Sequence, residues 1–422
     1  MEILFLFVSM FILITIGVPI GFAIGGATIL TFFMYSDMDM IVVAQYSITG
    51  LDSFPMMAIP FFILAGSIMS IGGVARRIVD VASHCIGFIT GGLGAVVSLA
   101  SLFFAAISGS ALATVSAIGG FMIPEMTRKG YDVGYSAALT ACAGTMGVII
   151  PPSIPLVIYG VVTGTSISNL FIAGIIPGLL IAFGMIVTNY IMSKKMGFQK
   201  SERQPFHMTL KSIWEAKWAL FAPIIILGGI YSGIFTPTEA AVVAVIYCAF
   251  VSMIFYRELT LKGLYQAFIE TAVVNGITTF LLGLSTAFAA YLSLEKVPAK
   301  LFELLTSITD DKILLLLIIN IALLLIGCFI DNIPATIILS PILLPVMVGL
   351  GISPIHFGIF LTINLTIGLV TPPYGCNLFV ASAVANIKME SMLKYLWPFL
   401  LTLIVVLFLT TYIPAITMVF VS

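Results

Sequence analysis

Charged residues are scarce in this chain. They make up 8% of its 422 residues, whereas soluble domains usually carry about 25%. The 17 Lys and Arg residues are balanced by 18 Asp and Glu residues, so there is no basic excess to bind nucleic acid. Hydrophobic residues reach 61%, more than a soluble fold could bury. This composition excludes a soluble enzyme, a disordered scaffold and a nucleic-acid binder, and it predicts a membrane protein.

Residues that carry catalytic or metal chemistry are also few. The five cysteines form no Cys-x-x-Cys pair, and the three histidines show no metal-ligand spacing. Gly-Lys-Ser, Gly-Lys-Thr, Gly-x-Ser-x-Gly and His-Glu-x-x-His are all absent from the sequence, so P-loop ATP hydrolysis and the common hydrolase sites are excluded. We expect no enzymatic activity and no catalytic residues, and we expect an ion gradient to supply energy.

Long apolar stretches fill most of the chain. They supply about ten to twelve segments of the roughly 20 residues that cross a bilayer. The main polar break covers residues 193–217 and is rich in Lys and Arg, which predicts a cytoplasmic loop. Within the second half, Thr236-Pro237-Thr238-Glu239 fits the start of a helix, with Thr236 as the cap. The sequence therefore predicts an all-α polytopic membrane protein.

The two halves of the chain form an internal repeat. A shift of 221 residues places Pro124 on Pro345, Gly147 on Gly368 and Pro151-Pro152 on Pro372-Pro373. These residues set backbone geometry rather than packing. We assign residues 1–192 to the first repeat, 193–217 to the cytoplasmic loop and 218–422 to the second repeat. Counting spans from the basic clusters makes the repeats inverted, with both termini periplasmic; a parallel duplication is the alternative, because the first span is short.

Each repeat contains an apolar stretch with a polar break. The first covers 93–127 and breaks at Ser108-Gly109-Ser110, and the second covers 313–348 and breaks at Asp331-Asn332. Each arm has about 15 residues, too few to cross a core of roughly 30 Å comfortably. We predict two re-entrant helical hairpins, each preceded by an amphipathic segment, at 78–90 and 296–308. Two ordinary short spans are the alternative in each case.

A discontinuous helix follows each hairpin. The helix at 135–162 is broken around Pro151-Pro152, and the helix at 358–385 around Pro372-Pro373. Consecutive prolines remove two amide donors and leave the preceding carbonyls without helical partners. Such carbonyls are costly in a membrane unless they meet protein, water or a cation.

Each half thus offers a polar hairpin tip and an unwound helix for a small hard cation. Neutral hydroxyl and carbonyl oxygens with at most one carboxylate favour Na⁺ over a transition metal. Half-helix N-termini facing the same pocket suit an anionic substrate group. Packing or local hydrogen bonding is the alternative role for the serines. The candidate Na⁺ ligands are Ser108, Ser110, Gly147, Ile150 and Pro152 in the first half and Asp331, Gly368, Thr371 and Pro373 in the second.

Asp331 is the only acidic or basic residue between Lys312 and His356. A charge at that depth costs a few kcal/mol, roughly 2.5 to 3.5 on insertion scales, so a partner is expected. Three roles compete: Na⁺ ligand, proton carrier, and contact to a hydroxyl or ammonium group of the substrate. A helix cap formed by Asp331 or Asn332 is compatible with each. The residues near the tips that could reach substrate are Ser110, Thr114, Asp331, Asn332 and Thr336.

Several motifs resemble the large membrane subunit of tripartite ATP-independent periplasmic (TRAP) transporters. They occur in order along essentially the whole chain: Gly17-Val18-Pro19-Ile20-Gly21, Ser108-Gly109-Ser110-Ala111, Gly147-Val148-Ile149-Ile150-Pro151-Pro152-Ser153, Asp331-Asn332 and Thr371-Pro372-Pro373-Tyr374-Gly375. The resemblance implies the ion transporter superfamily fold and an Na⁺-driven elevator mechanism in the bacterial inner membrane.

The resemblance also implies two protein partners and a substrate class. One partner is a small membrane subunit of about four helices, expected here as a separate chain because no such segment precedes Met1. The other is a periplasmic binding protein that delivers an organic acid, with sialic acid and C4-dicarboxylates as candidates. The alternative function is a stand-alone ion-coupled antiporter or organic-anion exchanger of the same fold. A channel is a third interpretation; it would conduct without saturation, whereas an elevator would not.

Overall fold

The computed structural model describes residues 2–36, 39–198, 205–309, 311–373 and 375–421, and over these ranges the fold is helical without strands. The all-α prediction is therefore confirmed. The first half contains α1 (Glu2–Thr15), α2 (Ile20–Tyr35), α3 (Ile41–Thr49), the 3₁₀ helix η1 (Phe54–Met57), α4 (Ala58–Ile71), α5 (Val74–Ile86), α6 (Gly92–Ser108), α7 (Ala111–Arg128), α8 (Val133–Ala143), the 3₁₀ helix η2 (Gly144–Val148), α9 (Ile154–Thr163) and α10 (Ile167–Met196).

The second half repeats this order. It contains α11 (Phe206–Tyr231), α12 (Pro237–Phe250), the π-helical turn η3 (Val251–Phe255), α13 (Leu261–Leu294), α14 (Val297–Ile308), α15 (Lys312–Gly327), α16 (Asn332–Gly349), α17 (Pro354–Gly368), α18 (Cys376–Ala385), α19 (Glu390–Tyr412) and the short α20 (Ala415–Met418). Shifting the first half by 221 residues places α7 on α16 at both ends and α9 within one residue of α18. Local helix boundaries therefore follow the repeat found in the sequence.

One long helix differs between the repeats. The segments α3, η1 and α4 of the first half correspond to the single helix α13, which runs unbroken for 34 residues. Pro55 lies in the first turn of η1, and the equivalent position in α13 is Gly276. Proline at this position removes an amide donor and interrupts a helix, whereas glycine lets it continue at a small cost.

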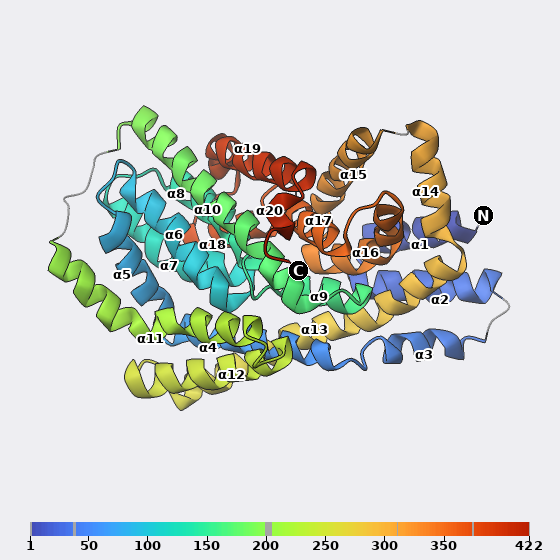
Figure 1. Ribbon diagram of the computed structural model, residues 1–422, viewed down its shortest axis with the longest axis horizontal. Helices are drawn as coiled ribbons and strands as arrows, with labels where there is room; N and C mark the ends of the chain where they lie inside the picture. Colours follow the sequence, from blue (N-terminus) through green and yellow to red (C-terminus); the bar gives the residue numbers. More distant parts are fainter. Residues whose placement is uncertain (1, 37–38, 199–204, 310, 374, 422) are drawn as a thin grey trace.

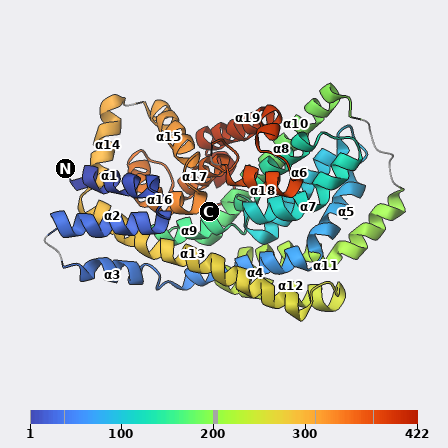
Figure 2. The ribbon, with the colours of Figure 1, turned by 180° about the vertical axis from the view of Figure 1, so that it is seen from behind.

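The helices form two groups that run mostly along the longest axis (Figure 1). The long helices α4, α11, α12 and α13 lie together along one edge, and the hairpins and broken helices lie on the other side (Figures 1 and 2). The arms α6 and α7 lie in one half of the molecule and α15 and α16 in the opposite half. The two hairpins therefore approach the middle from opposite ends.

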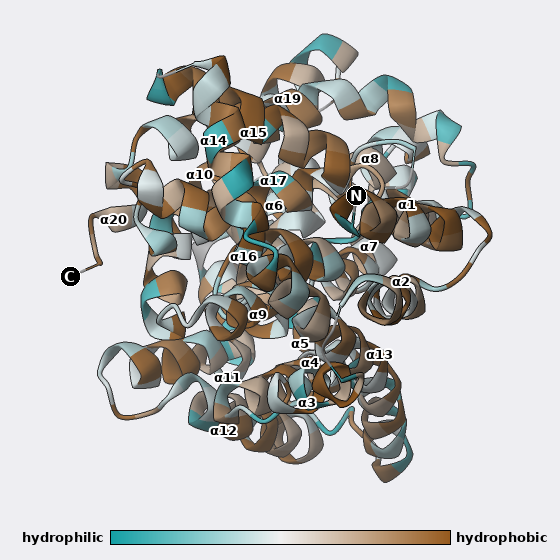
Figure 3. Cartoon of the chain, turned by 90° about the vertical axis from the view of Figure 1, so that its right-hand side faces the viewer, coloured by the Kyte–Doolittle hydropathy of each residue, from teal (hydrophilic) through white to brown (hydrophobic). Residues whose placement is uncertain are grey.

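Within the described ranges, seven helices are long and apolar enough to cross a membrane, judged by length and composition. They are Phe54–Ile71, Ile167–Met196, His207–Tyr231, Pro237–Phe255, Leu261–Leu294, Asn332–Gly349 and Glu390–Tyr412. The other apolar segments are shorter helices, such as α6 and both halves of the second broken helix, so the number of full-length spans is lower than the ten to twelve expected. Hydrophobic residues occupy most of the helical segments (Figure 3), and many of them face outward; Ile224, Ile246 and Ile277 are each more than 60% exposed.

Helix ends differ from the sequence expectation at two places. Helix runs to Met196 and resumes at Phe206, so much of the predicted loop 193–217 is helical; residues 199–204 lie outside the described ranges, as does Tyr374. Gly197 ends α10 in a left-handed conformation (φ 73°), after Lys194 and Lys195 in its last turn. The first amphipathic helix covers 74–86 rather than 78–90, because Gly73 (φ 76°) starts the helix earlier. At Thr236 the predicted cap is confirmed, with both bonds of the capping box present.

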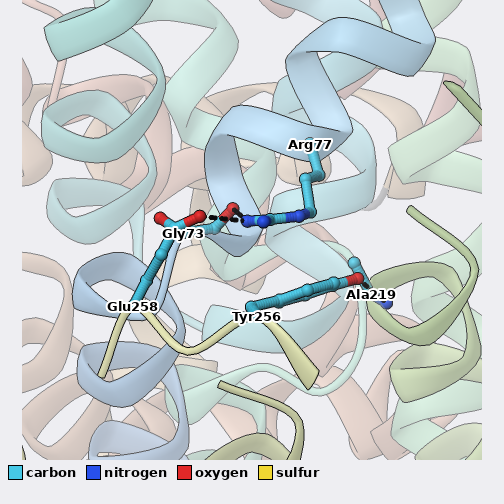
Figure 4. Close-up of polar contacts among 5 residues, drawn as sticks. All are labelled: Gly73, Arg77, Ala219, Tyr256 and Glu258. Carbon is cyan, nitrogen blue, oxygen red and sulfur yellow. Dashed lines mark hydrogen bonds and ion pairs between the residues drawn. The ribbon is translucent and has the colours of Figure 1, made fainter. Parts of the chain in front are cut away.

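The amphipathic helix α5 is fixed to the second repeat through Arg77 (Figure 4). Its Nη1 donates to Glu258 Oε1 at 2.7 Å and to the Gly73 carbonyl at 2.9 Å, and its guanidinium lies 3.8 Å from the centre of the Tyr256 ring. The Tyr256 hydroxyl accepts a bond from the Ala219 amide of α11 at 3.0 Å. Burial raises the pKa of Tyr256, so the ring stays neutral. One arginine therefore joins α5, α11 and the segment before α13.

Candidate functional site

A cavity of about 480 Å³ lies where the two hairpin tips meet the long helices. Ser108 and Ser110 from the first tip and Asp331 from the second line the same space. The opposite wall is formed by α4 and α13, which contribute Ser67 and Glu270 among others. Residues from both repeats, more than 200 positions apart in the sequence, thus form one polar pocket.

The first tip is a tight turn between α6 and α7. Gly109 adopts a left-handed conformation (φ 61°), which glycine adopts without strain. Ser110 caps α7, and its Oγ accepts a hydrogen bond from the Ala113 amide at 3.4 Å. Ser108 is buried at the end of α6, with its hydroxyl 3.2 Å from that of Thr114. Gly109 therefore lets the chain turn between the two helices, and the capping residue Ser110 lines the cavity.

The unwound segment of the first broken helix packs directly against this tip. A Cβ added to Gly147 would lie 2.3 Å from the Ser110 carbonyl oxygen, and one added to Gly109 would lie 2.8 Å from that of Pro152. The Ile154 amide donates to the Gly109 carbonyl at 3.3 Å. Ser108, Ser110, Gly147 and Pro152, which the sequence analysis assigned to the first ion site, therefore lie close together in the structure.

Two further residues define the first unwound segment. Ser153 donates to the Val148 carbonyl at 2.6 Å and accepts from the Leu156 amide at 3.3 Å, so it caps α9 and supplies one carbonyl with the partner that the broken helix removed. The side chain of Ile150 instead packs on α10, since a Cβ at Gly178 would meet it at 2.0 Å. Any contribution of Ile150 to the tip is therefore limited to its backbone.

The second tip is held differently. Asp331 caps α16, with Oδ1 accepting from the Asn332 amide at 2.8 Å, so the predicted cap is confirmed. Asn332 Nδ2 donates to Thr366 Oγ1 at 2.9 Å and ties the tip to α17. A Cβ at Gly368 would lie 2.0 Å from the Gly327 carbonyl oxygen, so Gly368 lies against the end of α15. The acidic side chain remains on the cavity.

The two unwound segments are not equivalent. Pro152 is buried, whereas Pro373 is exposed and Thr371 is half-buried. The Thr371 hydroxyl donates to the Ile367 carbonyl at 2.7 Å. Helix boundaries therefore correspond between the two halves after a shift of 221 residues, but the packing around each tip differs.

Of the five predicted substrate contacts, Ser110 and Asp331 line the cavity. Thr114 is buried and donates to the Ser110 carbonyl at 2.8 Å. Thr336 is buried and donates to Asn332 Oδ1 at 3.1 Å. Thr114, Asn332 and Thr336 therefore support the tips from inside the hairpins.

Sequence reasoning missed the opposite wall of the cavity. Glu270 lies within α13, and its Oε2 accepts from Ser67 Oγ of α4 at 3.0 Å while Oε1 accepts from Gln266 Nε2 at 3.0 Å. The signal was present, because Glu270 and Lys262 are the only charged residues of the segment Leu261–Leu294. An ionisable residue inside an apolar span marks a functional position by default.

Comparison with known proteins adds family information to this geometry. Residues 7–416 match the family model described as "Tripartite ATP-independent periplasmic transporter, DctM component". The isethionate TRAP transporter permease protein DctMQ of Oleidesulfovibrio alaskensis is 44% identical over 421 residues, a match that covers 100% of this chain and 66% of that relative. This chain therefore spans 66% of that relative's length.

Two further relatives match over nearly their full lengths. The C4-dicarboxylate TRAP transporter large permease protein DctM of Pseudomonas aeruginosa is 41% identical over 99% of this chain and 98% of its own. The sialic acid TRAP transporter large permease protein SiaM of Vibrio cholerae is 38% identical over 95% and 94%. Among solved structures, the Alcanivorax borkumensis YdaH transporter aligns with a TM-score of 0.65 at 14% identity, covering 88% of this chain and 87% of that one, so the two share a fold.

Proposed function

Because this chain belongs to the DctM family, the large permeases of TRAP transporters, we propose that it takes up an organic anion across the bacterial inner membrane, coupled to Na⁺. It is a multi-pass membrane protein and a transporter component rather than an enzyme. The resemblance stated from its motifs is confirmed by the family match.

One observation carries the proposal: Ser110 and Asp331, at the tips of two opposed hairpins, line one cavity. A site built at the interface of two inverted repeats is the arrangement expected of a secondary transporter. The tips belong to one group of helices and the opposite wall to the other. Movement of the hairpin-bearing group along α4 and α13 would expose the cavity on alternate sides, which is the elevator mechanism we propose.

The oxygens gathered at the first tip suit Na⁺ as the coupling ion. Hydroxyl oxygens of Ser108 and Ser110 and the backbone around Gly147 and Pro152 lie together. Neutral oxygen ligands are typical of sites for hard cations. At the second tip, Asp331 adds a carboxylate. We assign the ion-binding role to these two tips with their unwound segments.

The relatives suggest the class of substrate and partners. Those compared above are named as permeases for isethionate, C4-dicarboxylate and sialic acid, all of them organic acids. We expect this chain to work with a small four-helix membrane subunit and a periplasmic binding protein that delivers the substrate.

Uptake into proteoliposomes tests the proposal. The chain is reconstituted with its small subunit and binding protein, with and without an inward Na⁺ gradient and an inside-negative potential. We expect uptake of a labelled organic acid to require both Na⁺ and the binding protein. Uptake without Na⁺ would indicate that a proton carried by Asp331 is the coupling ion. Uptake without the binding protein would favour the stand-alone exchanger.

Two substitutions test the site itself. We expect Ser110→Ala and Asp331→Ala to abolish uptake, because each removes a tip oxygen from the cavity. Asp311→Ala is the matched control, since Asp311 caps α15 and lies outside the cavity. Losing either aspartate cap should lower the free energy of unfolding by about 1 kcal/mol. The control should therefore be as stable as Asp331→Ala but should still transport. Full uptake by a folded Asp331→Ala protein would overturn the assignment.

A further inference from the structure

Two carboxylates line the cavity and no basic side chain does, among the described residues. Asp331 comes from the second hairpin tip and Glu270 from the opposite wall. The positive end available to an anion is the N-terminus of α7, which the neutral Ser110 caps, because the Asp331 carboxylate already caps α16. Such an end accommodates one anionic group, but the two carboxylates would repel a second.

Glu270 is exposed, and two hydrogen bonds orient its carboxylate on the wall. It lies nine residues into α13, about 14 Å from the start of that helix at 1.5 Å per residue. Bonds from Ser67 and Gln266, both 3.0 Å long, reach separate oxygens of its carboxylate. A carboxylate oxygen can accept more than one hydrogen bond, so each retains capacity for a ligand donor.

The wall around Glu270 carries further hydroxyl groups that a ligand could bond. Thr271 lines the same cavity and is 6% exposed, and its hydroxyl has no hydrogen-bond partner among the described residues. Ser70 and Ser116 also line this space. A buried polar group without a partner costs free energy unless a ligand or water satisfies it. The polar wall therefore fits a ligand with hydrogen-bonding groups on the side away from the tips.

We propose that Glu270 is a specificity-determining residue that accepts a hydrogen bond from a hydroxyl or ammonium group of an organic monoanion, while the anionic group of that substrate lies at the hairpin tips. This inference rests on the proposed function and narrows its substrate class. It favours hydroxylated or amino-bearing monoanions and disfavours C4-dicarboxylates, whose second carboxylate would face Glu270.

Direct binding to the permease tests this inference, because the binding protein's own selectivity is then absent. The chain and its small subunit are placed in nanodiscs with saturating Na⁺. The probes are 2-hydroxyethanesulfonate, ethanesulfonate and succinate, measured by calorimetry. We expect the hydroxylated monoanion to bind at least about tenfold more tightly than either other probe, since a site built to bond a hydroxyl rejects analogues without it.

The Glu270→Leu variant removes the charge and both acceptor oxygens of the side chain. We expect the preference for 2-hydroxyethanesulfonate over ethanesulfonate to fall to about twofold or less, with succinate binding more tightly than to the wild type. Ser67→Ala removes the bond that orients the carboxylate and should lower the preference partly. Glu303→Leu is the matched control, since Glu303 is exposed on α14 outside the cavity.

The outcomes separate this inference from the proposed function. An unchanged preference in folded Glu270→Leu protein, or a wild type that binds all three probes alike, would overturn the inference. A changed Na⁺ dependence with unchanged probe preference would also overturn it and place Glu270 in ion coupling. The proposed function fails separately, if the reconstituted complex shows no Na⁺-dependent uptake of any organic anion.

Discussion

Gly147 lies where the unwound segment of the first repeat touches the hairpin tip. A Cβ there would meet the Ser110 carbonyl oxygen at 2.3 Å and the Thr114 hydroxyl at 2.6 Å. The first of these is backbone and cannot rotate away. At the second tip Gly368 permits a similar approach, but to Gly327. Glycine in both positions therefore serves close backbone contact, while the partner differs between the repeats.

We predict that Gly147→Ala displaces the first tip and strongly lowers uptake, because Ser110 can no longer hold its position at the cavity. Overpacking of this kind costs about 1–3 kcal/mol, which thermal unfolding in detergent would detect. Gly120→Ala on α7 is the control, because a Cβ there meets nothing within 4 Å. The control should be neutral or more stable by about 0.5–1 kcal/mol. Equal behaviour of the two variants would contradict the close-contact explanation.

At the scale of elements, the repeats differ most in what surrounds the hairpins. The helix α5 is joined to α11 and to the segment before α13 through Arg77 and Tyr256. The long helix of the first repeat is broken at η1, whereas α13 is continuous. The break follows from Pro55, which has glycine as its counterpart at position 276. Such differences allow the two halves of one pseudo-symmetric fold to have separate tasks.

Removal of the Arg77 side chain should release α5 from the second repeat. We predict that Arg77→Ala destabilises the protein by about 1–2 kcal/mol, the combined size of a partly buried ion pair and a cation–π contact. Arg76→Ala on the same helix changes the same charge at an exposed position and should leave the melting temperature nearly unchanged. If both variants unfold alike, the loss would reflect net charge rather than this junction. High salt should narrow the difference, because screening weakens the ion pair.

Across the whole molecule, α1–α3 and α14–α16 lie toward one end of the long axis and α5–α8 toward the other, with α13 running between them (Figures 1 and 2). The N-terminus lies at one end, while the end of α10 and the start of α11 lie at the other (Figure 1). With residues 193–217 rich in Lys and Arg, the positive-inside rule assigns the second end to the cytoplasm. If that assignment holds, the first repeat begins outside and the second inside; the inverted arrangement stays a prediction.

Labelling of single cysteines in a cysteine-free background tests this arrangement. We predict that Glu2→Cys reacts with an impermeant maleimide in intact cells, and that Lys195→Cys reacts after the membrane is permeabilised. A protein that retains only the buried native Cys142 gives the background in both cases. Reaction of both introduced cysteines from the same side would contradict inverted repeats.

Much of the fold could be predicted because its signals are local. Prolines and glycines recur at a fixed spacing; Gly130 and Gly351 follow the ends of α7 and α16 with positive φ, and the paired prolines interrupt the broken helices. The caps at Thr236 and Asp331 follow from side chains next to the amides that they satisfy. Boundaries near residues 74 and 206 were less accurate, because apolar periodicity alone does not fix where a helix starts.

Composition and residue spacing alone identify the chain as a helical membrane protein with an internal repeat, because both properties are expressed directly in the sequence. Only the tertiary structure decided which polar residues share a cavity. Ser110 and Asp331 meet there, Thr114, Asn332 and Thr336 are turned into the hairpins, and Glu270 faces the tips from α13. The physical reason is that such proximity depends on how distant helices pack, and no local pattern encodes that packing.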